Sequence, residues 1–88
     1  MKVVFLSSFK KDLVKINNLK LKGQIKAVII AVEVAESLKE LPNVKKIQGY
    51  PTAYRIRIGD YRLGLYIENG IIEMARLVKR NDIYKVFP

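Results

Sequence analysis

Residues 54 to 70 read YRIRIGDYRLGLYIENG, and they specify a β-hairpin together with its register. Apolar and polar residues alternate in both halves with the period of two that is typical of half-buried strands. Gly59 and Asp60 suit a two-residue type II′ loop, because glycine comes first. This loop pairs Ile58 with Tyr61, Arg57 with Arg62, Ile56 with Leu63, and Arg55 with Gly64.

The predicted pairing divides the hairpin into an apolar face and a basic face. Helices must cover the apolar face, which carries Tyr54, Ile56, Ile58, Tyr61, Leu63, Leu65 and Ile67; the basic face carries Arg55, Arg57, Arg62, Gly64 and Tyr66. Like charges directly opposite each other destabilise a sheet, so we expect the arginines to meet an anion from outside the chain. Gly64, which has no side chain, leaves room for another group to approach the backbone closely.

The next turn, ENG at residues 68–70, allows two registers for the last strand. A two-residue loop would pair Glu68 with Ile71 and place Arg76 beneath the helices. We expect the three-residue loop, a type I turn plus bulge, because it keeps this arginine out of the core. Glu73 then lies on the apolar face near the turn, and the basic face gains Arg76 and Arg80.

The first half of the chain predicts one strand and two helices. KVVFLS, residues 2–7, is a short β-branched run, and Ser7 or Ser8 can cap a helix that continues to about Asn17. A second amphipathic helix is predicted from about Ile25 to Leu38, stopped by Pro42 and Asn43. The predicted fold is one α+β domain, residues 1–88: an N-terminal strand, an antiparallel helical hairpin, then a three-stranded antiparallel meander, all in one mostly antiparallel sheet.

Composition limits the chemistry that the chain can perform. Seventeen Lys and Arg against eight Asp and Glu give a net charge of +9, which favours an acidic partner such as nucleic acid, an anionic membrane surface or an acidic protein. All five arginines lie between residues 55 and 80, and arginine suits phosphate oxygens better than lysine does. The absence of cysteine and histidine removes thiolate chemistry and the commonest metal ligand and general base. The N-terminal apolar run is too short for a signal peptide or a membrane span, so we expect a cytoplasmic protein with no membrane partner.

Two motifs at this spacing carry a family resemblance. The first motif is RIGDYR at residues 57–62, within the longer stretch YRIRIGDYRLGLYIENG. The second is ARLVKRNDIYKVFP at residues 75–88. Nearly the whole chain resembles the RelE/ParE toxin superfamily of bacterial and archaeal toxin–antitoxin systems, and its RelE-like members above all. The resemblance implies a cognate antitoxin that wraps the toxin in a hetero-oligomer, and a ribonuclease that cuts messenger RNA in the ribosomal A site.

The resemblance also implies which residues form the active site. The family's basic pair on the second strand falls on Arg55 and Arg57, and the arginine of its GDYR hairpin is Arg62. The arginine that closes the last strand is Arg80, and the tyrosine four residues on is Tyr84. Two departures stand out: Lys79 occupies a position where RelE-like sequences often have histidine, and some members have lysines in place of the arginine pair.

RNA cleavage without a metal or other cofactor requires charge stabilisation, a base and an acid. The 2′-hydroxyl attacks the adjacent phosphorus, leaving a 2′,3′-cyclic phosphate and a 5′-hydroxyl. The arginines can stabilise the negative charge that develops. The candidates for proton transfer are Tyr84, Lys79 and Glu73, since an arginine does not give up its proton.

Several assignments have a structural alternative. Tyr84 could be a packed terminal aromatic, and Tyr66 could stack on a base or merely pack across the strands. Lys45 and Lys46 are expected in a basic loop, either solvated or touching RNA backbone. Lys79 and Arg76 complete the expected substrate-binding set.

Three functions compete at this point. The preferred one is a RelE-like endoribonuclease acting on mRNA and the ribosome. The second is a ParE-like inhibitor of DNA gyrase without catalytic activity, against which the Arg80 and Tyr84 pair argues mildly. The third is an inactive basic nucleic-acid-binding domain.

Overall fold

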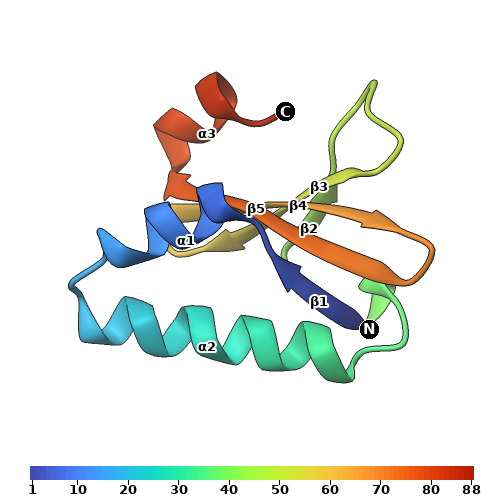
Figure 1. The fold of residues 1–88 in the computed structure, drawn as a ribbon, viewed down its shortest axis with the longest axis horizontal. Coiled ribbons are helices and arrows are strands. Elements are labelled where there is room, and N and C mark those ends of the chain that lie inside the picture. The colour runs from blue at the N-terminus through green and yellow to red at the C-terminus, as the bar shows by residue number, and fades with distance from the viewer.

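The computed structural model, which describes residues 1–88, contains one five-stranded mixed sheet and three α-helices (Figure 1). The sheet order is β1-β5-β4-β3-β2, with β1 parallel to β5 and every other pair antiparallel. The strands are β1 (Lys2–Phe5), β2 (Val44–Lys46), β3 (Ala53–Ile58), β4 (Tyr61–Glu68) and β5 (Ile71–Lys79). The helices are α1 (Ser7–Val14), α2 (Leu19–Val34) and α3 (Arg80–Val86), with a 3₁₀ turn at Leu38–Glu40. The predicted α+β class is confirmed, although β2 adds a strand that the sequence pattern did not predict.

The helices lie on opposite sides of the sheet. In Figure 1, α2 runs beneath the sheet and α3 lies above it, next to the C-terminus. The main core fills the α2 side and includes Phe9, Ile16, Leu21, Ile25, Val32, Ile56, Ile58, Leu63, Leu65, Ile72, Met74 and Leu77. A separate small cluster of Ala53, Ala75, Ile83 and Phe87 lies on the α3 side. No helix is long and apolar enough to cross a membrane.

The first hairpin has the predicted register. Gly59 has φ 57°, the left-handed value that a type II′ loop requires of its first residue. Arg57 lies opposite Arg62 and Arg55 opposite Gly64. Four of the residues predicted to face the helices, Ile56, Ile58, Leu63 and Leu65, are buried.

The second hairpin corrects the predicted register. Asn69 and Gly70 both have positive φ, 53° and 75°, so they form a two-residue loop that pairs Glu68 with Ile71. The expected three-residue loop is therefore wrong. An irregularity further along the strands, where Leu65 pairs with Met74 but Gly64 pairs with Arg76, leaves Ala75 as an extra residue. This bulge keeps Arg76 out of the core by a different route.

The predicted position of Glu73 on the apolar face is wrong for the same reason. It lies opposite Tyr66 and is exposed, so it belongs to the face away from α2 rather than to the apolar face.

The helix boundaries also differ from the prediction. The α1 N-terminus has no side-chain cap, because the N-cap residue is Leu6 and both predicted capping serines lie within the helix. Ser8 Oγ donates instead to the carbonyl of Ala75 at 2.6 Å. Asn18 starts α2 by accepting from Leu21 N at 2.9 Å, and the helix continues through Gly23. Its end at Val34 precedes the predicted stop at Pro42.

The N-terminal ammonium group of the chain binds the C-terminal end of α2, which ends before the predicted stop at Pro42 and Asn43. The Met1 ammonium donates to the carbonyls of Val32, Glu33 and Ala35 at 3.3, 2.8 and 2.9 Å. A cation at a helix C-terminus is favourable because the last carbonyls lack partners within the helix.

Candidate active site

The arginines of β3 and β4 surround an open hollow of about 370 Å³ on the sheet face away from α2. Its lining is Asn43, Val44, Lys45, Arg55, Arg57, Arg62 and Tyr84. The Arg57 N–H bonds to Asn43 O at 3.1 Å, on the β2 side, so Arg57 and Arg62 form a non-hydrogen-bonded pair. Facing side chains come closest in such pairs. The hollow is therefore strongly positive.

No carboxylate neutralises these arginines. The two ion pairs in the molecule join Arg76 to Asp12 and Lys85 to Asp82. Buried or crowded cations in proteins are normally paired, and unpaired clusters of them favour binding of an anion.

Arg62 is held in place by the hairpin loop itself. Its Nη1 donates to the carbonyls of Gly59 and Tyr61, both at 2.9 Å. Partial burial lowers the pKa of Arg62, and the positive charges of Arg57 and Arg80 lower it further. The folded protein thus holds a cation in an unfavourable field, which an incoming phosphate would relieve.

The third helix adds Tyr84 and Arg80 to the arginines. Arg80 N donates to Asp60 O at 2.8 Å, which ties the start of α3 to the first hairpin loop. One helical turn later the Tyr84 ring lies 4.7 Å from Arg55 Cζ, a cation–π contact. Tyr84 remains 67 % exposed, so it is not the packed terminal aromatic considered as its alternative role. That part is taken by Phe87, which is buried.

Strand β2 separates the two candidate lysines. Lys45 lies opposite Arg55 and lines the hollow, whereas Lys46 lies opposite Tyr54 and belongs to the other face. Asn43, left-handed at φ 63°, also lines the hollow and was missed from the sequence. A positive φ at a non-glycine residue is uncommon but asparagine tolerates it, so only the turn-forming character of Pro42-Asn43 could have indicated it.

Arg76 lies outside the hollow because a buried acid binds it. Asp12, which is 5 % exposed, accepts from Arg76 Nε at 2.8 Å, Arg76 Nη2 at 3.1 Å and Leu77 N at 2.9 Å. The hydrogen bond to Asp12 raises the pKa of Arg76. Asp12 was also missed, although an acid one residue before Leu13 on the apolar side of a predicted helix is the signal that could have found it.

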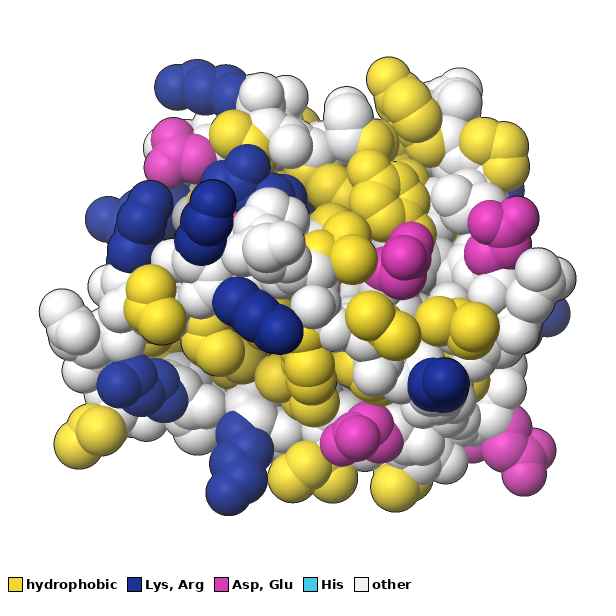
Figure 2. All heavy atoms as spheres, in the orientation of Figure 1, with side chains coloured by type: hydrophobic (Ala, Val, Ile, Leu, Met, Phe, Trp, Pro, Cys, Tyr) yellow, Lys and Arg dark blue, Asp and Glu magenta, His cyan; other side chains and the backbone are white.

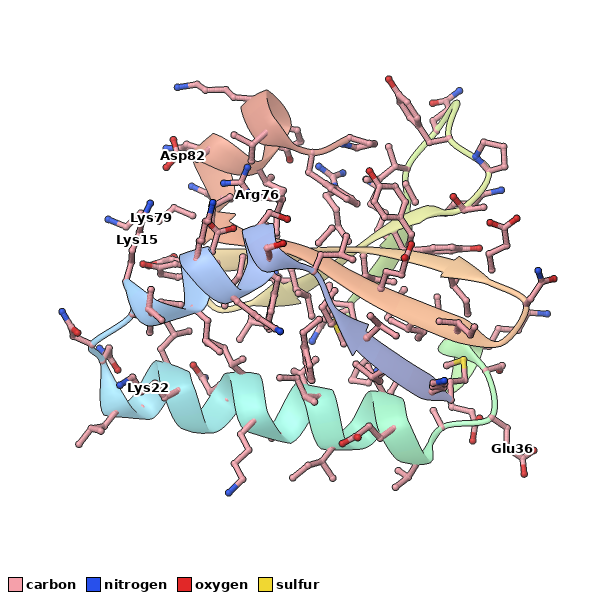
Figure 3. The ribbon with its side chains drawn as sticks, in the orientation of Figure 1. Lys15, Lys22, Glu36, Arg76, Lys79 and Asp82 are labelled. Carbon is pink, nitrogen blue, oxygen red and sulfur yellow. The ribbon has the colours of Figure 1, made fainter.

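Lys79 belongs to the same corner as Arg76. Figure 3 shows both near Lys15 and Asp82, between α1 and the start of α3. These four residues, with Asp12 and Tyr61 among others, line a second hollow of about 320 Å³. On the face seen in Figure 2, Lys and Arg side chains gather toward this side of the molecule. Lys79 therefore does not line the hollow that contains Tyr84.

Tyr66 and Glu73 lie together at the other end of the sheet. The Tyr66 ring packs against Phe87, with centroids 5.0 Å apart. Tyr66 and Glu73 line a third hollow of about 440 Å³ together with Glu68. This places Glu73 in an acidic hollow, separate from the arginines.

The arrangement can bind a phosphodiester and stabilise added negative charge on it. Arginine forks on two neighbouring strands can donate charge-assisted hydrogen bonds to phosphate oxygens. The hydroxyl of Tyr84 can donate or accept a proton next to them.

Comparison with known proteins gives the family. No family model matches the chain. Toxin RelE3 of Methanocaldococcus jannaschii is 38% identical over 89 residues, covering 100% of both chains. The RelE-type chain in the solved RelB–RelE antitoxin–toxin complex from Methanococcus jannaschii is 35% identical, with a TM-score of 0.81 over 97% of this chain and 99% of that one. The archaeal RelE–RelB complex from Pyrococcus horikoshii shares the fold, with a TM-score of 0.73, 22% identity, and coverage of 90% and 93%. The chain belongs to the RelE family of toxin–antitoxin toxins.

Proposed function

We propose that this toxin is a metal-independent endoribonuclease that cleaves messenger RNA at the ribosome, in the cytoplasm. The observation that carries the proposal is a hollow that three arginines, Arg55, Arg57 and Arg62, line together with Tyr84 and without a carboxylate partner. The positive charge of Arg80 also acts on Arg62. A single-stranded phosphodiester supplies the negative charge that the group lacks.

The reaction transfers a phosphoryl group within the RNA. The 2′-oxygen bonds to phosphorus, the bond from phosphorus to the 5′-oxygen breaks, and the products carry a 2′,3′-cyclic phosphate and a 5′-hydroxyl. Arg57 and Arg62 stabilise the additional negative charge of the transition state. Loss of one such donor typically costs about 2.7–4 kcal/mol of transition-state stabilisation.

Two protons move in this reaction. The 2′-hydroxyl loses one to a base, and the departing 5′-oxygen takes one from an acid. Tyr84 is proposed for proton transfer, because its hydroxyl-bearing ring lines the arginine hollow, whereas Lys79 and Glu73 line other hollows.

The partner that silences the toxin is proposed to be a cognate antitoxin, bound in a hetero-oligomer. Related toxins were solved in complex with RelB antitoxins, as described above. A net charge of +9 favours an antitoxin segment rich in acidic residues.

Induction in growing cells tests the function. The 5′ ends of cellular RNA would be mapped for the wild type and for Arg62→Ala. We expect cuts in phase with codons for the wild type and none for the variant. DNA breaks with intact RNA would instead identify a ParE-like gyrase inhibitor, and an absence of both would identify a basic binding domain without activity.

A further inference from the structure

A contact beside the arginine hollow, on the residue that pairs with Arg55, holds the helix that carries Tyr84. The ring of Phe87, the residue after α3, lies directly on the backbone of Gly64 in β4. A Cβ atom on Gly64 would stand 2.6 Å from both Cγ and Cδ2 of that ring. Ordinary carbon contacts are about 3.5–4.0 Å, so only glycine allows this approach.

The other attachments of α3 are few. Its start is tied by Arg80 N to Asp60 O at 2.8 Å, and its middle is anchored by the buried Ile83. The exposed Tyr84 adds its cation–π contact with Arg55 at 4.7 Å. The remaining ion pair, Lys85 to Asp82 at 4.0 Å, lies within the helix and is exposed. A seven-residue helix is too short to be stable alone, so packing of Ile83 and Phe87 decides its position.

The small cluster under α3 is separate from the main core. Ala53, Ala75, Ile83 and Phe87 form it, whereas the twelve-residue core lies around α2 on the other face. Loosening the Phe87 contact therefore moves α3 without dismantling the sheet. The backbone positions of Arg55, Arg57 and Arg62 are fixed by the pairing of β3 with β4 and not by α3.

We propose that Phe87 and Gly64 are positioning residues, which seat α3 so that Tyr84 and Arg80 meet the arginines of β3 and β4. Neither residue lines the arginine hollow. The expected effect on the cleavage rate rests on the proposed ribonuclease function. The expected effect on the position of Tyr84 rests on the geometry alone. A displacement of roughly 1 Å at a reacting group can lower a rate by about 10²-fold.

Gly64→Ala is the sharpest test, because it adds one methyl group at the contact. The ring of Phe87 must retreat by roughly 1 Å to restore an ordinary separation. The matched control is Gly23→Ala, since a Cβ atom at Gly23 in α2 meets nothing within 4 Å. Phe87→Leu, which keeps an apolar side chain, is the second variant and is expected to lie between wild type and Gly64→Ala.

Two readouts are needed. Single-turnover cleavage of ribosome-bound mRNA is expected to fall at least 10-fold in Gly64→Ala while affinity stays within about threefold, as for a misplaced catalytic group. Fluorine NMR of fluorotyrosine-labelled protein, with Tyr84 assigned by Tyr84→Phe, reports the helix position without any activity. We expect its resonance to shift in Gly64→Ala while those of Tyr54 and Tyr61 do not, and no change in Gly23→Ala.

The outcomes separate the two proposals. An unchanged Tyr84 resonance in Gly64→Ala would overturn the positioning role, whatever the rate. A shifted resonance with a wild-type rate would also overturn it. If the wild type does not cleave RNA but the resonance shifts, the seating of α3 by this contact stands and the ribonuclease proposal fails.

Discussion

Asp12→Ala should destabilise the fold more than any exposed charge substitution. The carboxylate is 5 % exposed and accepts three hydrogen bonds, from Arg76 Nε, Arg76 Nη2 and Leu77 N. An unsatisfied Leu77 N–H costs about 1–3 kcal/mol. Breaking a fully buried ion pair costs about 3–5 kcal/mol, but Arg76 is 29 % exposed and water would replace part of the interaction.

The expected loss is therefore about 3 kcal/mol of unfolding free energy, estimated from these two contributions. A domain of this size loses about 4–8 °C of melting temperature per kcal/mol, so Tm should fall by about 12–24 °C. Circular dichroism during heating measures this. Asp12→Asn keeps an acceptor for Leu77 N and should lose less.

Two comparisons make the reasoning refutable. Asp82→Ala removes an exposed pair at 4.0 Å and should change stability by less than about 0.5 kcal/mol. Arg76→Met combined with Asp12→Ala should cost less than the sum of the single changes, because the two side chains interact. A Tm loss below about 4 °C in Asp12→Ala, or strict additivity, would show that the pair does not hold α1 to β5.

Three further outcomes concern the arginine hollow. Because the pKa of Arg62 is lower in the folded protein, its positive charge costs folding free energy wherever it stays protonated, which includes neutral pH. Arg62→Gln should therefore melt no lower than wild type in circular dichroism. A loss of several degrees would mean that the hydrogen bonds of Arg62 to the loop are structural. With about five cations in contact with RNA, the slope of log affinity against log salt concentration should be about −3.5. Affinity measured by filter binding should then fall roughly 100-fold between about 50 and 200 mM salt. An affinity that stays constant over this range would exclude the basic face as the contact surface. Tyr84→Phe should lower the single-turnover rate by roughly 10²-fold with binding unchanged, and Lys79→Ala should lower it by less. The reverse ranking would mean that Lys79, and not Tyr84, carries the proton.

Local patterns predicted the first hairpin well, and long-range contacts could not be predicted. The Gly59-Asp60 loop determines its own register, so the pairing of Arg57 with Arg62 followed from adjacent residues. The bulge at Ala75 did not, because a period of two gives no sign of an inserted residue. The three-residue loop predicted for the second hairpin is wrong because a two-residue loop buries Arg76 only when the strand is regular.

Strand β2 and the Asp12 pair were missed for related reasons. Three residues with two lysines carry no strand periodicity, and β2 forms only because β3 offers it an edge. The partners Asp12 and Arg76 are 64 residues apart, a distance that periodicity cannot bridge. The basic face of the first hairpin was predicted from its alternating pattern, and the role of Tyr84 from the family resemblance, whereas nothing in the sequence pattern pointed to Phe87.

The ends of the cut RNA test the central claim most directly. Purified toxin would be incubated with ribosomes carrying a synthetic mRNA, and the termini of both fragments identified by mass spectrometry. We expect a 2′,3′-cyclic phosphate upstream and a 5′-hydroxyl downstream, and no cut when the nucleotide before the cleavage site lacks its 2′-hydroxyl. A 3′-hydroxyl with a 5′-phosphate, or cleavage of the 2′-deoxy substrate, would contradict attack by the 2′-oxygen and the roles given to the arginines and Tyr84.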